Sequence, residues 1–448
     1  MARGDFDVEA APKLQTRPRR ILAYCGRKMV LTMGSTSGVA KRHGLTVVKS
    51  LTGSASGQHV LSSRGVDPQT VLRNLSLEFA VRGAEQDKPV RLPGILAAAK
   101  VHPASANATG LSIPSQLIRY YGSYVASAYV NQPATDIINM NLAHNQATGR
   151  GAVVATIDTG VDFSHPVLNN SLRSGWDFVH NTAGGQEMAD VNQETTPILD
   201  QETTPILDGG SAIILQQETT PILDQETTPI LDGKKFPAFG HGTMTAGLIH
   251  LLAPEAEIMP LRAFGADGSA TVSQIVSAIS YAIDHHVDVI NMSFSVKQDS
   301  PALSGALDLA TKAGIICVAS AGNDGSTTKV WPAAYDDNVI SVAGTNNSLF
   351  PSTWSNHGEW VTMAAPDEGV ITTYPEGHYA KSSGTSFAAP QVAGAAALLV
   401  DINKRTNQSL AESGLTSSAH SLAESLGLGA GVLDLNQACL AAARKKSD

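Results

Sequence analysis

Four short glycine-containing segments of this 448-residue chain carry side chains that together could cleave a carbonyl–nitrogen bond. A serine hydroxyl becomes a strong nucleophile when an imidazole accepts its proton, and a buried carboxylate can hold that imidazole in the required tautomer. A nearby amide N–H can stabilise the oxyanion that forms on the attacked carbonyl. The segments supply an acid, a base, an amide and a nucleophile, in that order: Ile157-Asp158-Thr159-Gly160, Gly240-His241-Gly242-Thr243, Ala321-Gly322-Asn323 and Gly384-Thr385-Ser386-Phe387-Ala388-Ala389-Pro390.

The four segments differ in how specific they are. An Asp-Thr-Gly turn is common at strand ends, and Gly-His-Gly-Thr alone is only moderately specific. The segment around Ser386 is strongly specific, because glycine permits a tight turn before the serine and small residues let the following helix pack closely. In the order Asp, His, Ser, the segments resemble the motifs of subtilisin-like serine proteases, the subtilase family. The resemblance runs from about residue 132 to about residue 440.

This resemblance implies a role for each of the four side chains. Ser386 is the implied nucleophile, His241 is the general base and then the general acid, and Asp158 is the carboxylate that orients the imidazole. Asn323 matches the oxyanion-hole amide of the family, and the backbone N–H of Ser386 is the second donor. These four residues form the predicted catalytic site.

Two further segments resemble the substrate cleft of the family. Residues 289–294, Val-Ile-Asn-Met-Ser-Phe, resemble the strand whose backbone pairs with an extended substrate. The resemblance places the walls of the primary specificity pocket at residues 293–295 and 320–322. The predicted substrate-binding residues are Ser293, Phe294, Ser295, Ser320, Ala321 and Gly322. These small and apolar walls do not by themselves fix the preferred substrate side chain.

The elements that must position these groups form an alternation of apolar runs and helical periodicities after residue 152. Strands are expected at 152–157, 287–292 and 314–319, and helices at 273–285, 303–313 and 386–400. This alternation predicts an α/β fold, and the resemblance implies a subtilisin-like parallel sheet flanked by helices. Asp158 and Asn323 follow strands, whereas His241 and Ser386 begin helices. Strand carboxyl ends and neighbouring helix N-termini collect functional groups, so one shared cleft is expected.

The length of the chain indicates more than one folded unit, because single cores rarely grow beyond about 250–300 residues. Residues 132–448 are the predicted catalytic domain. Residues 1–37 are expected to be an irregular N-terminal extension. Residues 93–131, which include a stretch rich in Ser, Asn, Ala and Gly, are the predicted linker with the processing site.

Residues 38–92 are interpreted as a small α+β unit. Strand patterns occur at 45–51 and 58–61, Asp67-Pro68 is a good helix start, and an extended stretch begins at Phe79. This order resembles the inhibitory propeptide of subtilases, which would make the chain a zymogen. The alternative is a small accessory domain.

An acidic insert separates the predicted acid from the predicted base. The octapeptide Gln-Glu-Thr-Thr-Pro-Ile-Leu-Asp occurs four times without a mismatch in residues 193–232. These repeats carry nearly all of the net charge of −9, which leaves the remainder near neutrality and argues against a nucleic-acid-binding face. Three interpretations remain open: a self-stacking structural appendage, which the composition favours, a substrate-binding exosite, or a cation-binding array.

No cofactor is expected to be required for the chemistry, and no metal is predicted at the site. Structural calcium stays open, but it is not predicted at the usual strong site of the family. The chain passes directly from Leu248 to Met259-Pro260-Leu261 without a long ion-binding loop, and Val167 stands where the usual aspartate ligand would be. Three cysteines cannot build a disulfide framework.

Family resemblance implies a secreted protein, although the N-terminal sequence contains no clear signal peptide, since Arg27 and Lys28 interrupt its apolar stretch. No apolar run reaches the about 18 residues of a membrane span, so no span is predicted. The expected partners are protein or peptide substrates and the chain's own propeptide.

The leading hypothesis is a serine endopeptidase that hydrolyses peptide bonds through an acyl-enzyme and is self-processed from a zymogen. One alternative is a catalytically limited protein of subtilase fold that binds partners through the acidic repeat insert. Another is an enzyme limited to one self-cleavage event. All four catalytic positions are filled, which favours the leading hypothesis.

Phe387 stands beside the nucleophile, where many secreted subtilases have methionine. Peroxide converts a thioether to a polar sulfoxide. We therefore expect wild-type activity to survive a mild peroxide treatment that inactivates the Phe387→Met variant, measured as residual peptide hydrolysis. Rapid inactivation of the wild type, with Ser386 shown to be unmodified by mass spectrometry, would contradict this expectation.

Overall fold

The computed structural model describes residues 19–24, 33–50, 58–63, 67–76, 83–87, 89–92, 116–190, 213–215 and 238–447. The chain forms two compact units, one from residues 1–51 with 56–87 and one from residues 52–55 with 88–448. All four copies of the octapeptide, and residues 93–115 of the predicted linker, lie outside the described residues.

The smaller unit contains an antiparallel sheet with the strand order β2-β3-β1-β4. Its elements are β1 (Arg19–Tyr24), α1 (Met33–Arg42), β2 (Leu45–Ser50), β3 (Gln58–Ser63), α2 (Pro68–Ser76) and β4 (Gly83–Gln86). Asp67 caps α2, because its carboxylate accepts the backbone N–H of Thr70 at 3.0 Å. The described core of this unit includes Leu61, Val71 and Leu75.

The predicted irregular extension over residues 1–37 is wrong at two places. Residues 19–24 form β1, which pairs with both β3 and β4, and α1 begins at Met33. The pairing partners of β1 lie 34 or more residues further along the chain. A short local pattern therefore carried too little information to reveal this strand.

The larger unit is built on a sheet with the order β10-β9-β12-β8-β14-β15-β16-β17. The strands are β8 (Val153–Asp158), β9 (Gly175–Asp177), β10 (Thr182–Gly184), β12 (Glu257–Arg262), β14 (Val289–Met292), β15 (Ile316–Ser320), β16 (Ile340–Thr345) and β17 (Met363–Pro366). Strands β9 to β17 of this sheet pair in parallel, and β10 pairs antiparallel with β9. The parallel α/β architecture expected from the sequence is confirmed.

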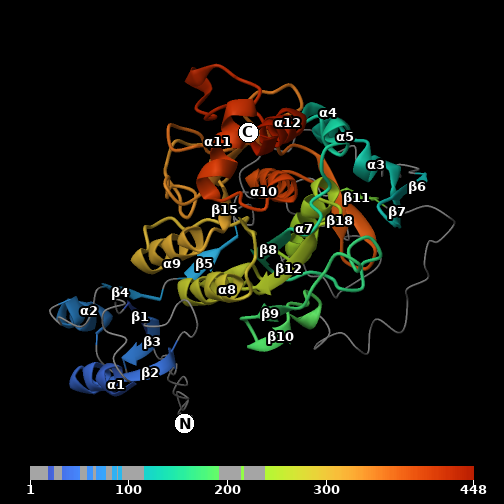
Figure 1. Ribbon diagram of the computed structural model, residues 1–448. Coiled ribbons are helices and arrows are strands. Elements are labelled where there is room, and N and C mark those ends of the chain that lie inside the picture. Colours follow the sequence, from blue (N-terminus) through green and yellow to red (C-terminus); the bar gives the residue numbers. More distant parts are fainter. Residues whose placement is uncertain are drawn as a thin grey trace, which may run out of the picture. The chain divides into compact units, whose positions relative to one another are not determined.

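Helices cover both faces of this sheet. They are α7 (His241–Leu252), α8 (Val272–Asp284), α9 (Pro301–Lys312) and α10 (Thr385–Ile402). Figure 1 shows α8 and α9 on one side of the sheet and α7 and α10 on the other. The predicted strands and helices of this region agree with the observed ones to within about two residues at most ends.

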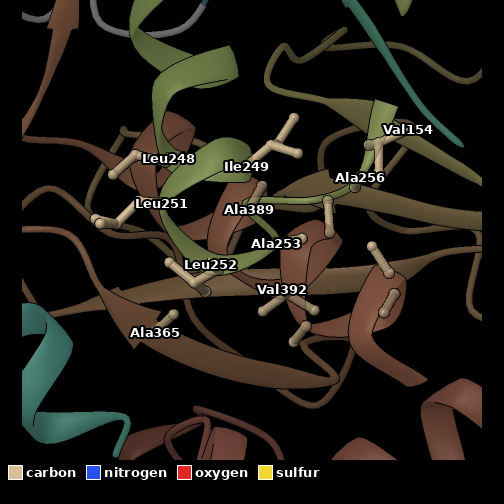
Figure 2. Close-up of a cluster of buried hydrophobic side chains, with 14 of the residues drawn as sticks. Val154, Leu248, Ile249, Leu251, Leu252, Ala253, Ala256, Ala365, Ala389 and Val392 are labelled. Atoms are coloured by element: carbon tan, nitrogen blue, oxygen red, sulfur yellow. The ribbon is translucent and has the colours of Figure 1, made fainter. Parts of the chain in front are cut away.

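The core lies between α7, α10 and the sheet. Figure 2 shows Leu248, Ile249 and Leu252 of α7 beside Ala389 and Val392 of α10, and all five are buried. Among the described helices, α10 alone is long and apolar enough to resemble a membrane span, but nearly all of it is buried inside the fold. It is therefore a core helix, and its burial explains its continuous apolar sequence.

Smaller elements complete the larger unit. They are β5 (Pro89–Arg91), β6 (Leu117–Tyr120), β7 (Ser123–Ala126), α3 (Ser127–Val130), α4 (Pro133–Ile137), α5 (Met140–Ala143), β11 (Ile213–Leu215), β13 (Ser269–Thr271), β18 (Val370–Tyr374), β19 (His378–Ser382), α11 (Gln408–Ser418), a 3₁₀ turn (Glu424–Leu426) and α12 (Leu435–Ser447). The hairpin β6–β7 and α3 show that the predicted linker is folded from Gln116 onward. Strand β11, between the two pairs of octapeptides, pairs in parallel with β19.

Helix α7 packs closely against β18 at Gly247. A Cβ atom at Gly247 would lie 2.1 Å from Thr373 Oγ1 and 2.9 Å from Thr373 N, so Gly247→Ala must displace β18. We expect this variant to lose about 1–3 kcal/mol of unfolding free energy. Denaturant melts in a Ser386→Ala background would measure the loss without self-digestion.

Gly414 in α11 provides the matched control. A Cβ atom there would meet only Leu399 Cδ1, at 3.6 Å, which is ordinary van der Waals contact. Gly414→Ala should be neutral or stabilising by up to about 1 kcal/mol, because alanine favours a helix over glycine. Equal unfolding free energies for Gly247→Ala and Gly414→Ala would show that the close packing at Gly247 does not restrict the residue there.

Candidate active site

The predicted acid and the predicted base meet where β8 ends and α7 begins. Asp158 is fully buried at the end of β8, and His241 is the first residue of α7. His241 Nδ1 lies 2.8 Å from Asp158 Oδ1. The Thr159 N–H donates to the same carboxylate at 2.7 Å, and the Thr245 hydroxyl donates to its other oxygen at 3.1 Å. The carboxylate therefore accepts hydrogen bonds at both oxygens.

The hydrogen bond to Asp158 assigns the proton of the neutral imidazole to Nδ1, which leaves the lone pair on Nε2. Nε2 is buried and has no hydrogen-bond partner among the residues that the structure describes. Burial lowers the pKa of His241, but the charge and hydrogen bond of Asp158, with a smaller contribution from Glu187, raise it above the ordinary 6.5. The ring is thus ready to accept a proton at Nε2 and to stabilise the resulting charge.

The predicted nucleophile lies at the start of α10. Ser386 is the second residue of this helix and follows Gly384, which has a φ of +131°. A Cβ atom at Gly384 would lie 3.1 Å from Asn323 Nδ2, so glycine is needed there for both backbone and space. Ser386 Oγ lies 3.4 Å from the Ser293 carbonyl oxygen, which is at the outer limit of a hydrogen bond. The hydroxyl is therefore only weakly held.

The side chain next to Ser386 connects the nucleophile to the base. The Phe387 ring packs against the His241 ring with a centroid distance of 5.8 Å. Both rings are almost completely buried. The start of α10 and the start of α7 are thus adjacent, and the structure brings Asp158, His241 and the Ser386 segment into one place.

Asn323 follows β15 and is fixed by the nucleophile loop. Its Oδ1 accepts the Thr385 N–H at 3.0 Å and the Thr385 hydroxyl at 2.7 Å. Since a backbone N–H can only donate, these bonds assign the oxygen to Thr385 and leave Nδ2 on the other side, near Gly384. Within the described part of the chain, Nδ2 has no acceptor and lies beside the predicted nucleophile segment, which is where the predicted oxyanion-hole donor is expected.

The predicted substrate-binding residues divide into two groups. Ser293 donates its hydroxyl proton to the Ser386 carbonyl oxygen at 2.9 Å, and the Gly322 N–H donates to Thr385 Oγ1 at 3.1 Å, so both contact the nucleophile segment. Ser295 is partly exposed nearby in sequence. The side chain of Phe294 instead packs in the core, 5.2 Å from the Phe264 ring, and leaves only its backbone for a pocket wall.

The other wall segment is also buried. Ala321 accepts the Asn356 side-chain amide at 3.0 Å through its carbonyl oxygen. Ser320 is fully buried, and its hydroxyl has no hydrogen-bond partner in the described part of the chain. The segment 320–322 is thus held rigidly between Asn356 and the nucleophile loop.

A strand pair that the sequence did not predict lies close to the acid. The N–H groups of Ala263 and Phe264, just after β12, donate to the Asp158 carbonyl oxygen at 3.0 and 3.1 Å. The chain continues into β13, which pairs antiparallel with β5. The Leu92 N–H extends this pairing to the Gly268 carbonyl oxygen at 3.1 Å, and Val90 and Leu92 are buried. An upstream segment of the chain is thus bound, extended, near the site.

Sequence reasoning also missed Glu187, which is almost completely buried beside the acid and the base. Its Oε1 accepts the Gly240 N–H at 2.8 Å and the Thr159 hydroxyl at 2.5 Å. Its Oε2 accepts the Thr243 N–H at 3.1 Å and the Thr243 hydroxyl. Nothing in the local sequence distinguishes this glutamate, because no motif surrounds it.

The residue at the usual calcium position does not fit a cation. Val167 is apolar, is 1% exposed and packs in the main hydrophobic core. Its side chain offers no oxygen, so it cannot replace the carboxylate ligand expected at this position.

A model described as the subtilase family matches residues 149–431. The thermophilic serine proteinase of Bacillus sp. (strain AK1) is 35% identical over 56% of this chain, and the match spans about half of that relative, 52%. Thermitase of Thermoactinomyces vulgaris is 32% identical over 56% of this chain and 76% of its own length. The major intracellular serine protease of Bacillus subtilis (strain 168) is 30% identical over 58% of this chain and 72% of its own length.

A solved structure has the same fold. Fervidolysin from Fervidobacterium pennivorans, described as a keratinolytic enzyme related to subtilisin, superposes with a TM-score of 0.66 at 18% identity. The match covers 96% of this chain and 62% of that one. The family model covers more than half of the chain, and the site has the residues and contacts described above. The chain therefore belongs to the subtilase family of serine endopeptidases.

Proposed function

We propose that this protein hydrolyses peptide bonds through an acyl-enzyme formed on Ser386. The observation that carries the proposal is the buried Asp158–His241 pair: His241 Nε2 has no partner among the described residues, and its ring lies beside the start of α10. The weak 3.4 Å contact of Ser386 Oγ costs little to break when the hydroxyl turns toward that nitrogen. Family membership independently supports endopeptidase activity.

The first half of the reaction transfers the acyl group to the enzyme. The Ser386 hydroxyl proton passes to His241 Nε2 while Oγ bonds to the substrate carbonyl carbon. Asn323 Nδ2 and the Ser386 N–H donate to the resulting oxyanion. When the carbon–nitrogen bond breaks, His241 returns its proton to the leaving amine, which departs as the first product.

Water completes the cycle. It gives a proton to His241 Nε2 as its oxygen bonds to the ester carbon, and the second tetrahedral intermediate uses the same oxyanion donors. The bond to Oγ then breaks, and the His241 proton returns to Ser386. Because His241 must be neutral to accept a proton, and its pKa is raised, we expect kcat/KM to fall on acidification from above pH 6.5.

Substrates are proposed to bind as extended strands. The backbone of β13, which pairs with β5, supports this, since β13 accepts an extended antiparallel segment next to the acid. The residues after β14 offer a second edge at Ser293–Ser295. Main-chain pairing of this kind holds a peptide without fixing its sequence, so protein and peptide substrates in general are proposed.

The chain is also proposed to process itself. Residues 89–92 pair with β13, and the chain next appears in the described fold at Gln116, whose carbonyl oxygen accepts the Ser127 N–H at 2.8 Å. Of the predicted processing region 93–131, residues 93–115 could be cut without breaking a described strand pair. Residues 38–92 would then be the chain's own propeptide.

No cofactor is proposed for hydrolysis, because the side chains described above supply each proton transfer and the oxyanion donors. A secreted location also stays a proposal. The matched relatives include subtilisin E and two proteins named as intracellular serine proteases, so relatedness alone does not assign a compartment.

Comparison of wild type with Ser386→Ala tests the reaction and the processing together. We expect the wild type to shorten itself by cleavage within residues 93–131 and to hydrolyse casein and a chromogenic peptide. The variant should stay at full length, by intact mass, and should be inert. If both proteins are folded, full-length and inactive, the proposed function is wrong.

Asn323→Ala tests the oxyanion donor. Removal of the corresponding amide from a subtilisin lowers kcat by about 10²–10³, and we expect a loss of that size here with little change in KM. Asn347→Ala, in an exposed loop, is the matched control and should retain full activity. A loss below about threefold in Asn323→Ala would exclude its side chain from transition-state stabilisation.

A further inference from the structure

We propose that Glu187 is a positioning residue for the catalytic base. Its ionised carboxylate, which comes from a distant part of the same chain, caps the N-terminus of α7 and holds His241 in place beside Asp158. The role rests on the proposed peptidase function, which it deepens. Glu187 lies at the end of the Gly184-Gly185-Gln186 segment, between β10 and the acidic insert. It belongs to none of the catalytic motifs.

Helix α7 has no capping side chain of its own. Its N-cap residue is Gly240, which has a φ of +88° and cannot accept a hydrogen bond from the first turn through a side chain. The first N–H groups of a helix need acceptors, usually supplied by the N-cap side chain to the second or third residue. Here Thr159 Oγ1 accepts the Gly242 N–H at 2.9 Å, and Glu187 accepts the Thr243 N–H at 3.1 Å.

Glycine is required at the N-cap, which explains why the cap comes from elsewhere. A Cβ atom at Gly240 would lie 2.4 Å from the Tyr374 ring. A Ser, Thr or Asp cap therefore does not fit, and a distant carboxylate must supply the missing acceptor. Glu187 also accepts the Gly240 N–H at 2.8 Å, so its contacts bracket His241 on both sides.

The surrounding hydrogen bonds determine the charge state of Glu187. Thr159 Oγ1 and Thr243 Oγ1 each accept a backbone N–H, from Gly242 and Asp162, so their own protons point to the carboxylate. With two backbone N–H groups in addition, four donors and no acceptor face it among the residues that the structure describes. Burial raises the pKa of Glu187 to about 7, and the hydrogen bonds from Thr159 and Thr243 act in the opposite direction and favour the ionised form.

The charge of Glu187 acts on the base as well. It raises the pKa of His241, after the larger contributions of Asp158. The charge of Asp158 raises the pKa of Glu187 in turn. Tyr374, on β18, also faces this region, and its pKa is raised by burial and by the charges of Glu187 and Glu376. Arg262 lies beyond Thr159, where its guanidinium pairs with Asp177 and Asp190.

Glu187→Gln keeps the shape of the side chain and removes its charge. We expect kcat to fall about ten- to hundredfold, the scale of a slightly misplaced catalytic group, with KM within about twofold of wild type. The acid limb of the pH profile, which is the fall of kcat/KM at low pH, should also move to lower pH. The reason is that loss of a nearby negative charge lowers the pKa of His241. A purely structural cap would not move this limb in the protein that remains folded.

Two variants make the test specific. Glu187→Asp retains the charge at shorter reach, so it should keep the acid limb near that of wild type while kcat is partly lost. Glu257→Gln makes the same chemical change in the exposed ion pair with Arg173 and should alter neither quantity. If Glu187→Gln does not fold, the acid limb and the kcat of Glu187→Asp test the proposal instead. A wild-type kcat in Glu187→Asp, despite its shorter side chain, would overturn the positioning role.

An inactive background separates this role from the proposed function. In Ser386→Ala protein, the His241 pKa followed by NMR should be lower when Glu187→Gln is added. An unchanged His241 pKa, or unchanged kcat and acid limb in active Glu187→Gln, would overturn the inference while the peptidase function stands. A wild type without Ser386-dependent hydrolysis would instead overturn the proposed function, and the positioning role with it.

Discussion

The buried charge of Asp158 is the constraint on which the rest of the site depends. A carboxylate removed from water is strongly destabilising unless donors and an opposite charge surround it. His241 and Thr245, which are four residues apart on one face of α7, both reach this carboxylate. The requirement to satisfy Asp158 therefore fixes the position of α7 against the end of β8. Because α10 packs on α7, the same requirement extends to the start of the helix that carries Ser386.

A second cluster of charged side chains holds the turn at residues 158–160 through its backbone. Arg262, on β12, is fully buried and donates to the Thr159 carbonyl oxygen at 3.0 Å. Its guanidinium also pairs with Asp177 at 2.7 Å and Asp190 at 2.5 Å. Removal of one partner from such a buried set leaves an uncompensated charge, which costs about 3–5 kcal/mol. The turn after β8 is thus held by hydrogen bonds through both its side chain and its backbone, and the site can be rigid although its residues come from distant segments.

The candidate catalytic segments could be recognised in the sequence because each combines a reactive side chain with local residues that a tight turn or a close helix contact requires. The sheet could be predicted because its strands are continuous apolar runs between helical periods. The contacts of Glu187 could not be predicted, because its four donors are brought together only by folding. Strand β1 and the β5–β13 pair escaped for a related reason, since short strands are defined by partners far along the chain. The sequence motif placed Phe294 in the wall of the pocket, but its side chain packs in the core against Phe264.

Ala266 gives the acidic insert a fixed base. Its N–H donates to the Asp190 carboxylate at 2.8 Å, and its carbonyl oxygen accepts the Ala238 N–H at 2.9 Å, so the described residues on either side of the insert are hydrogen-bonded to one residue. A change in the number of octapeptides therefore need not disturb the residues that flank the insert, because Ala266 holds both of them and the repeats do not.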